Sequence, residues 1–322
     1  MSTTKPLKLE KVKFTGAVSV HIISNKSELK AIKEVGDLAA KIGKRVGEQE
    51  LVFSIPSKDK LTIIAKPKTE SEVSYIFQSA RALGARLKKI LNAEEASSAT
   101  IVSQSLKPTE TVAILEGIVL ANYQFLTYKT GENNKPNKLA KLGVLADAVS
   151  KQDLDELSAV TTGTYAARDF VNEPVITLTA TEWSKRIATL GKESGFKTTV
   201  LDKKKIETLK MGGLLGVNKG SVEPPTFNIL EWKPKNAKNK KPIVLVGKGV
   251  VYDTGGYNIK TVQMAQMKSD MGGGAAVSGA MAAISASKLP VHVIALIPAT
   301  DNRIDGKAIV ADDVLTMMSV AA

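Results

Sequence analysis

The chain has 322 residues, a formal net charge of +13 and no cysteine. Its hydrophobic content of 43% and charged content of 24% are typical of a soluble globular protein with about two domains. No apolar run approaches the ~18–20 residues of a membrane span, and the N-terminus shows no signal-peptide core. We therefore expect a cytoplasmic protein that does not interact with a membrane.

The first 160 residues alternate short apolar runs with helical patterns, which predicts an N-terminal α/β domain over residues 1–160. The expected strands of this part are residues 17–23, 49–54, 61–65 and 100–102. The expected helices are residues 30–42, 70–91 and 109–123.

Residues 151–172 are predicted to form a long linker helix that joins the two halves of the chain. Acidic residues at its start suit a helix N-terminus, and Pro174 ends it. Residues 173–322 then begin a second α/β pattern, in which the glycines at 212 and 213 are expected to stop a helix. The expected helices of this part are residues 181–194, 203–211 and 273–287. The expected strands are residues 198–201, 227–232, 243–246 and 291–297.

The most informative block is residues 246–274, where charged residues follow short apolar runs among glycines. Lys248 and Asp253 each follow such a run, and Lys260 and Asp270 come after them. Because ligands in α/β proteins bind just outside the carboxyl ends of strands, these side chains predict a site.

A metal at this site would have to be held mainly by carboxylate oxygen. The chain has no cysteine, and its histidines are His21 and His292, both in apolar strand patterns where a core position is favoured over ligation. Thiolate and multi-histidine zinc sites are therefore excluded.

The block resembles the signature of the M17 leucyl aminopeptidase family, V-G-K-G-[IV]-x-[FY]-D-[ST]-G-G-x-x-[IL]-K followed by M-K-x-D-M-G-G-[AG]-A. Residues 116–129, 168–174 and 211–225 resemble three further blocks of the family, in the right order. The resemblance implies a macro-like N-terminal α/β domain and a C-terminal mixed-sheet metallo-exopeptidase domain.

The resemblance also implies roles for single residues. Lys248, Asp253 and Asp270 match the ligands of a pair of divalent metal ions, Zn²⁺ or Mn²⁺, and Lys260 matches the lysine that polarises the scissile carbonyl. Such a metal pair can activate one shared water, and Lys248 would bind as the neutral amine. The implied activity is the release of N-terminal amino acids from peptides by a homo-hexamer.

One family block is not found, N-T-D-A-E-G-R-L-[IV]-L-A-D. In the family its Asp and Glu complete the metal pair, and its Arg holds a bicarbonate. Residues 305–312 imitate the block but lack the Glu and the Arg, so we interpret them as a decoy. We therefore expect a catalytic domain that is incomplete at its C-terminal side and impaired in activity. The alternative is an inactive family member that acts as a scaffold.

Lysine-rich runs at 203–205 and 233–241 raise a further alternative, because some bacterial members of the family bind DNA. Aromatic residues make up only 5% of the chain, and none alternate with these lysines as a stacking platform for single strands requires. Solvated loops are the favoured interpretation, and nucleic acid is the less favoured partner.

Overall fold

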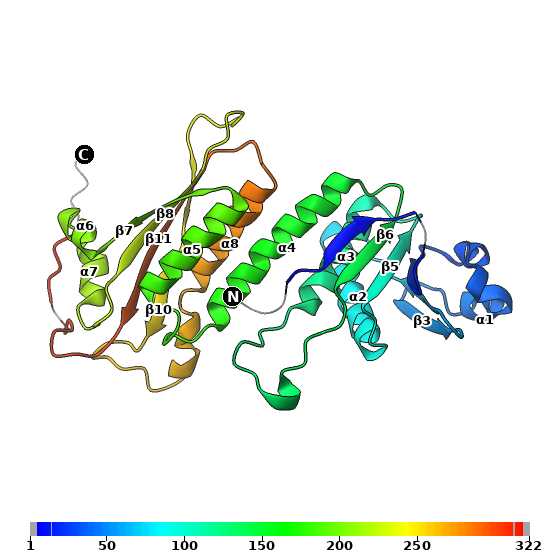
Figure 1. The fold of residues 1–322 in the computed structure, drawn as a ribbon, viewed down its shortest axis with the longest axis horizontal. Helices are drawn as coiled ribbons and strands as arrows, with labels where there is room; N and C mark the ends of the chain where they lie inside the picture. The colour runs from blue at the N-terminus through cyan, green and yellow to red at the C-terminus, as the bar shows by residue number, and fades with distance from the viewer. Residues whose placement is uncertain (1–4, 14, 312, 318–322) are drawn as a thin grey trace. The chain divides into compact units, whose positions relative to one another are not determined.

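The structure is a computed structural model that describes residues 5–13, 15–311 and 313–317. The chain divides into two compact units, Ser2–Thr161 and Thr162–Ala322 (Figure 1). The boundary falls inside helix α4 (Lys151–Asn172), whose bounds are those of the predicted linker helix. In the described part of the chain, no helix combines the length and apolarity needed to cross a membrane.

The N-terminal unit is built on a six-stranded sheet with the order β1-β6-β5-β2-β4-β3. All neighbouring strands are parallel except β3 and β4, which are antiparallel. The strands are β1 (Lys8–Lys11), β2 (Val18–Ile22), β3 (Leu51–Pro56), β4 (Leu61–Lys66), β5 (Ser98–Ser103) and β6 (Lys141–Leu145). The helical segments are η1 (Lys26–Ala31), η2 (Lys33–Leu38), α1 (Ala39–Gly43), α2 (Val73–Ala93), α3 (Pro108–Asn122) and η3 (Gly131–Asn133).

Helices α2 and α3 pack closely because each contributes a glycine to the contact. A Cβ on Gly84 would lie 2.2 Å from the carbonyl oxygen of Ile114, and a Cβ on Gly117 would lie 2.2 Å from that of Arg81. The close approach of the two backbones therefore requires both glycines.

Gly84→Ala should lower the free energy of unfolding by about 1–3 kcal/mol, because the added methyl forces the two helices apart. Urea denaturation of the variant and the parent chain measures the change. Gly47→Ala is the matched control, since a Cβ there has no neighbour within 4 Å. Equal midpoints for the Gly84 variant and the parent would show that the helices separate without cost.

One prediction for this unit was wrong, and two strands were not predicted. Residues 30–42 form no single helix; they belong to η1, η2 and α1. The chain is extended at Ile32, between η1 and η2, and it bends again at Gly36, whose φ of 44° lies in the left-handed region. Strands β1 and β6 were not predicted, because one is a short charged edge strand and the other a short strand that includes Gly143.

The C-terminal unit is built on a mixed sheet with β11 at its centre. The order is β10-β11-β8-β7, and β9 pairs with β11 as well. Strand β11 is parallel to β9 and β10 and antiparallel to β8. The strands are β7 (Lys197–Leu201), β8 (Thr226–Trp232), β9 (Ile243–Val246), β10 (Gly249–Asp253) and β11 (Val293–Asn302). The helical segments are α5 (Ala180–Ser194), α6 (Lys203–Thr208), α7 (Gly212–Asn218), η4 (Met264–Ser269) and α8 (Gly272–Ala286).

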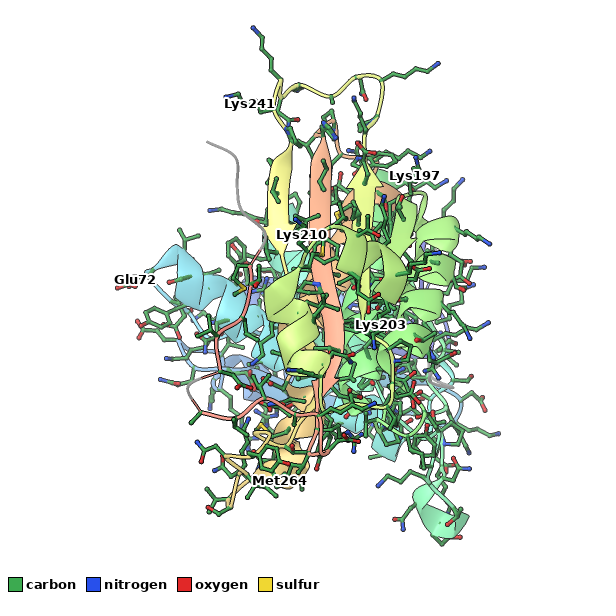
Figure 2. The ribbon with its side chains drawn as sticks, turned by 90° about the vertical axis from the view of Figure 1, so that its left-hand side faces the viewer. Glu72, Lys197, Lys203, Lys210, Lys241 and Met264 are labelled. Carbon is green, nitrogen blue, oxygen red and sulfur yellow. The ribbon has the colours of Figure 1, made fainter. Side chains whose placement is uncertain are left out.

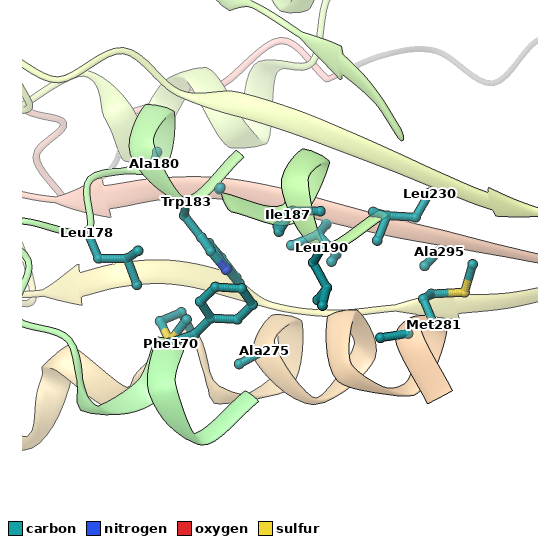
Figure 3. Packing of buried hydrophobic residues seen from close by; sticks show 14 of the residues in the cluster. Phe170, Leu178, Ala180, Trp183, Ile187, Leu190, Leu230, Ala275, Met281 and Ala295 are labelled. Atoms are coloured by element: carbon teal, nitrogen blue, oxygen red, sulfur yellow. The ribbon is translucent and has the colours of Figure 1, made fainter. Parts of the chain in front are cut away.

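One face of this sheet forms the core together with α4, α5 and α8 (Figure 3). Trp183 of α5 is fully buried there and meets Phe170 edge-on, with 6.0 Å between the ring centroids. The odd-numbered residues of β11, from Val293 to Ala299, point into the same cluster. The mixed α/β fold predicted for this part of the chain is confirmed.

The glycines at 212 and 213 begin α7; the prediction that they end a helix was wrong. A Cβ on Gly212 would lie 1.7 Å from the carbonyl oxygen of Thr316. These glycines therefore allow a distant segment to approach the helix, a tertiary requirement that local sequence patterns do not reveal.

Strand β9 exposes apolar side chains, and β11 is its partner among the described strands. Ile243, Val244 and Val246 are 49%, 50% and 71% exposed. The lysine-rich loop that precedes β9 is also exposed, as predicted for a solvated loop. Figure 2 shows Lys241 of this loop and Met264 of η4 at opposite ends of the sheet.

Candidate metal centre

The candidate site is assembled where β9 and β10 break and where α8 begins. Gly247 and Lys248 separate the two strands, and Asp253 is the last residue of β10. Asp270 follows η4, two residues before α8. Because the amide of Gly274 donates to the carbonyl oxygen of Lys248 at 2.8 Å, the start of α8 is fixed against the strand break.

Asp253 and Lys260 form a close ion pair. Lys260 Nζ donates to Asp253 Oδ2 at 2.6 Å, and the aspartate side chain is 16% exposed. Asp253 Oδ1 accepts from the amide of Gly255 at 2.9 Å and from Asn302 Nδ2 at 2.8 Å. Burial would raise the pKa of Asp253, but the three hydrogen bonds outweigh it and hold the pKa below its usual value of 3.8. The carboxylate is therefore ionised and held in one orientation.

Lys248 and Asp270 form the second pair. Lys248 Nζ lies 2.9 Å from Asp270 Oδ2, an ion-pair distance, while the lysine side chain is 60% exposed. Asp270 Oδ2 is itself buried, and no described residue donates a well-aligned hydrogen bond to it. A buried carboxylate oxygen that lacks an aligned hydrogen-bond donor can bind a cation more strongly than it binds this lysine.

The two pairs are connected through η4. Lys260 Nζ also contacts Met267 Sδ at 3.1 Å, and the carbonyl oxygen of Met267 accepts from the amide of Asp270. The structure therefore brings the four predicted residues to one end of the C-terminal sheet.

Asn302 was not predicted as a site residue, although it contacts Asp253 directly. A signal was present in the sequence, because Asn302 follows the apolar run of β11, and polar residues at strand ends line ligand sites. The neighbouring Asp301 is 3% exposed and accepts from Arg303 Nε at 2.9 Å. Arg303 in turn lies over the ring of Tyr252, 5.4 Å from its centroid.

The segment interpreted as a decoy lies beside the site, because residues 308–311 line a cavity with Gly255, Gly256 and Asn302, but its described acidic residue, Asp305, belongs to no metal-binding group. Asp305 lies in an exposed turn, and its side chain accepts from the amide of Lys307. Asp312 lies outside the described residues. Within the described ranges, no three His, Asp or Glu side chains come together as a metal-binding group.

The donor set therefore fits divalent metal ions only in part. Two carboxylates and one lysine amine would hold an ion, and the unsatisfied Asp270 Oδ2 favours such a role. Two carboxylates supply too little negative charge for two dications. The residues described here thus fit one ion better than a pair.

An apolar cavity of about 380 Å³ adjoins Lys248. Its walls come from α7, the ends of β9 and β10, and β11, and it is lined by Leu214, Val217, Val246, Gly247, Lys248, Gly249, Val250, Pro298 and Thr300. The cavity therefore places an apolar surface beside Lys248.

His292 lies away from these groups, just before the start of β11. His292 Nε2 lies 3.0 Å from Glu231 Oε1, and the histidine side chain is 11% exposed. His21 lies in β2 of the other unit, where burial lowers its pKa. Both histidines are half-buried, so neither occupies the fully buried core position that was predicted.

The fold and the site together define a two-unit α/β protein with a lysine–carboxylate cluster at one end of a mixed sheet. Residues 165–321 match the family described as the cytosol aminopeptidase family, catalytic domain. Residues 165–321 thus carry the catalytic-domain pattern of the M17 peptidases, the family that the sequence motifs predicted.

Curated relatives extend the similarity beyond that domain. A probable cytosol aminopeptidase of Chlorobaculum tepidum is 45% identical over 227 residues, covering 66% of this chain and 45% of the relative. Another from Brucella anthropi is 35% identical over 300 residues, covering 91% of this chain and 59% of the relative. The chain thus spans about half the length of the curated relatives that it matches.

Solved structures show the same fold. The bottromycin maturation enzyme BotP, in complex with Mn, matches with a TM-score of 0.76 and 26% identity, over 93% of this chain and 62% of that one. A tomato leucine aminopeptidase matches with a TM-score of 0.80 over 98% of this chain and 66% of that one. At 19% identity, this second likeness supports the fold alone.

Proposed function

We propose that this chain forms the metal-binding part of an aminopeptidase that releases N-terminal amino acids from peptides. The observation that carries the proposal is the paired arrangement of Lys248 with Asp270 and of Lys260 with Asp253. These are the residues that match the family motif. The match of residues 165–321 to the cytosol aminopeptidase family supports the reaction class.

Asp253, Asp270 and the neutral amine of Lys248 are the proposed metal ligands. Bound divalent ions would lower the pKa of a water molecule and polarise the peptide carbonyl. The Mn complex of BotP supports a divalent ion at sites of this kind. The choice between Zn²⁺ and Mn²⁺, hexameric assembly and a cytoplasmic location are parts of the same proposal.

Lys260 is proposed to remain protonated and to stabilise negative charge on the carbonyl oxygen during attack. In the structure its ammonium donates to Asp253 Oδ2. A cation that binds Asp253 would compete with this contact, so Lys260 would become free to face the substrate. The lysine would thus pair with the carboxylate before metal binding and with the substrate oxygen afterwards.

Lys260→Ala should lower kcat by about 10²–10³, as the loss of one oxyanion donor does in other enzymes, while metal content is unchanged. Steady-state hydrolysis of a leucine anilide measures kcat, and metal analysis of the same samples measures the metal content. The substitution is made in a form of the protein that itself hydrolyses the anilide. Lys240→Ala, at the other end of the sheet, is the matched control. A wild-type kcat with a raised KM would instead assign Lys260 to uniform substrate binding.

A further inference from the structure

Asn302 lies directly beside the candidate ligand Asp253, on the neighbouring strand. It is the last residue of β11, and its Cα is the register partner of Asp253 across the strand pair. Its side-chain amide donates to Asp253 Oδ1 at 2.8 Å. Its carbonyl oxygen accepts from the amide and the hydroxyl of Thr254, at 3.0 and 2.9 Å. Asn302 is therefore fixed by backbone contacts while its side chain holds the carboxylate.

The two carboxylate oxygens of Asp253 differ in the number of hydrogen bonds that they accept. Oδ1 accepts two hydrogen bonds, from Asn302 and from the amide of Gly255, which together use about two acceptor positions. Among the described residues, Lys260 alone donates a hydrogen bond to Oδ2. Of the two oxygens, Oδ2 is thus the one that retains a free acceptor position.

Gly256 lies close to the Asn302 amide. A Cβ on Gly256 would lie 3.2 Å from Asn302 Oδ1, and Gly256 has a φ of +65°. The glycine therefore leaves room for the amide in its present orientation. Because the Asn302 side chain is neutral, it can hold Asp253 without competing for a cation as a lysine does.

We propose that Asn302 is a positioning residue that locks Oδ1 of Asp253 and so presents Oδ2 to a divalent ion. This inference rests on the proposed metal-binding function. It concerns the orientation of a ligand, since Asn302 itself would not touch the ion. Partners that orient a metal ligand in this way typically contribute about 10–100-fold to metal affinity.

The test is a titration of the 322-residue chain with Mn²⁺, in which the free ion is followed by electron paramagnetic resonance. Asn302→Leu keeps a similar side-chain volume but removes the donor, so it should weaken Mn²⁺ binding by about 10-fold or more. Asn302→Gln retains an amide and should recover part of the affinity. Asn236→Leu, in the exposed loop before β9, is the matched control and should bind like the parent. The melting temperature of each metal-free variant is measured in parallel.

Weaker Mn²⁺ binding by Asn302→Leu, with an unchanged melting temperature, supports the positioning role. The inference is overturned by parent-like affinity of Asn302→Leu. It is also overturned if the Leu and Gln variants lose affinity equally, because amide donation would then be irrelevant, or if affinity and melting temperature fall together.

Asp253→Ala separates this inference from the proposed function. If Asp253→Ala loses Mn²⁺ binding while Asn302→Leu retains it, only the positioning role fails. If Asp253→Ala binds Mn²⁺ like the parent, or if the parent binds none, the proposed metal site fails and the positioning role fails with it.

Discussion

Asp253→Ala should abolish tight binding of divalent ions by this chain. The substitution removes the carboxylate that accepts from Lys260, Gly255 and Asn302, and with it half of the negative charge at the candidate centre. The remaining carboxylate, Asp270, lies 2.9 Å from the Lys248 amine and would face a dication alone. A single carboxylate compensates only part of the charge of a dication, so affinity should fall to that of a surface carboxylate.

Metal content after dialysis against Mn²⁺ or Zn²⁺, together with calorimetric titration, measures this loss. Asp305→Ala is the matched control, because Asp305 lies in an exposed turn within the segment that imitates a family block. Unchanged metal stoichiometry in the Asp253 variant would remove Asp253 from the ligand set. A thermal melt of the metal-free variant shows whether the loss of three hydrogen bonds has also destabilised the fold.

The positions of Lys248 and Asp253 at strand ends could be predicted from the sequence, because they depend on local patterns. Lys248 and Asp253 each follow a short apolar run, and both runs are observed as strands. The glycines of this block also behave as expected, since Gly255 has a φ of 90° and its amide donates to Asp253. Residue type and spacing were therefore sufficient to place the charged groups at strand ends.

The sequence predicted less where structure depends on distant contacts. Asn302 is 49 residues from Asp253, and its role follows from the parallel pairing of β10 with β11. That pairing is a tertiary property that the pattern of either strand alone does not contain. The start of α7 at Gly212 is a second example, since the glycine is required by the approach of Thr316.

The remaining errors concern weak local signals. A helical pattern over residues 30–42 is interrupted at the extended Ile32 and at Gly36, which takes a left-handed conformation, and shorter helical segments replace the single helix. Strand β1 has four residues and a charged composition, so its own sequence does not predict a strand. Its pairing with β6 stabilises the extended conformation.

Residues 1–322 by themselves should show little or no hydrolysis of a leucine anilide, even with excess Mn²⁺ or Zn²⁺. A pair of dications carries four positive charges, while Asp253 and Asp270 provide two negative ones, and no third acidic side chain joins them in the described part of the chain. The second ion should therefore bind weakly, and a water molecule between two ions would lack one of its activators. The exposed apolar residues of β9 should also promote aggregation during the assay.

The decisive comparison is between this chain and a fusion that adds the part of the Chlorobaculum tepidum relative that follows the matched region. The fusion should bind a second Mn²⁺ and gain turnover, because added carboxylates would balance the second dication. Asp253→Ala in the fusion is the matched control and should remove both gains. Robust turnover by residues 1–322 alone would contradict the charge argument. It would indicate that Asp301, Asp305 or Asp312 supplies the missing negative charge, and alanine variants of these residues would identify which one does.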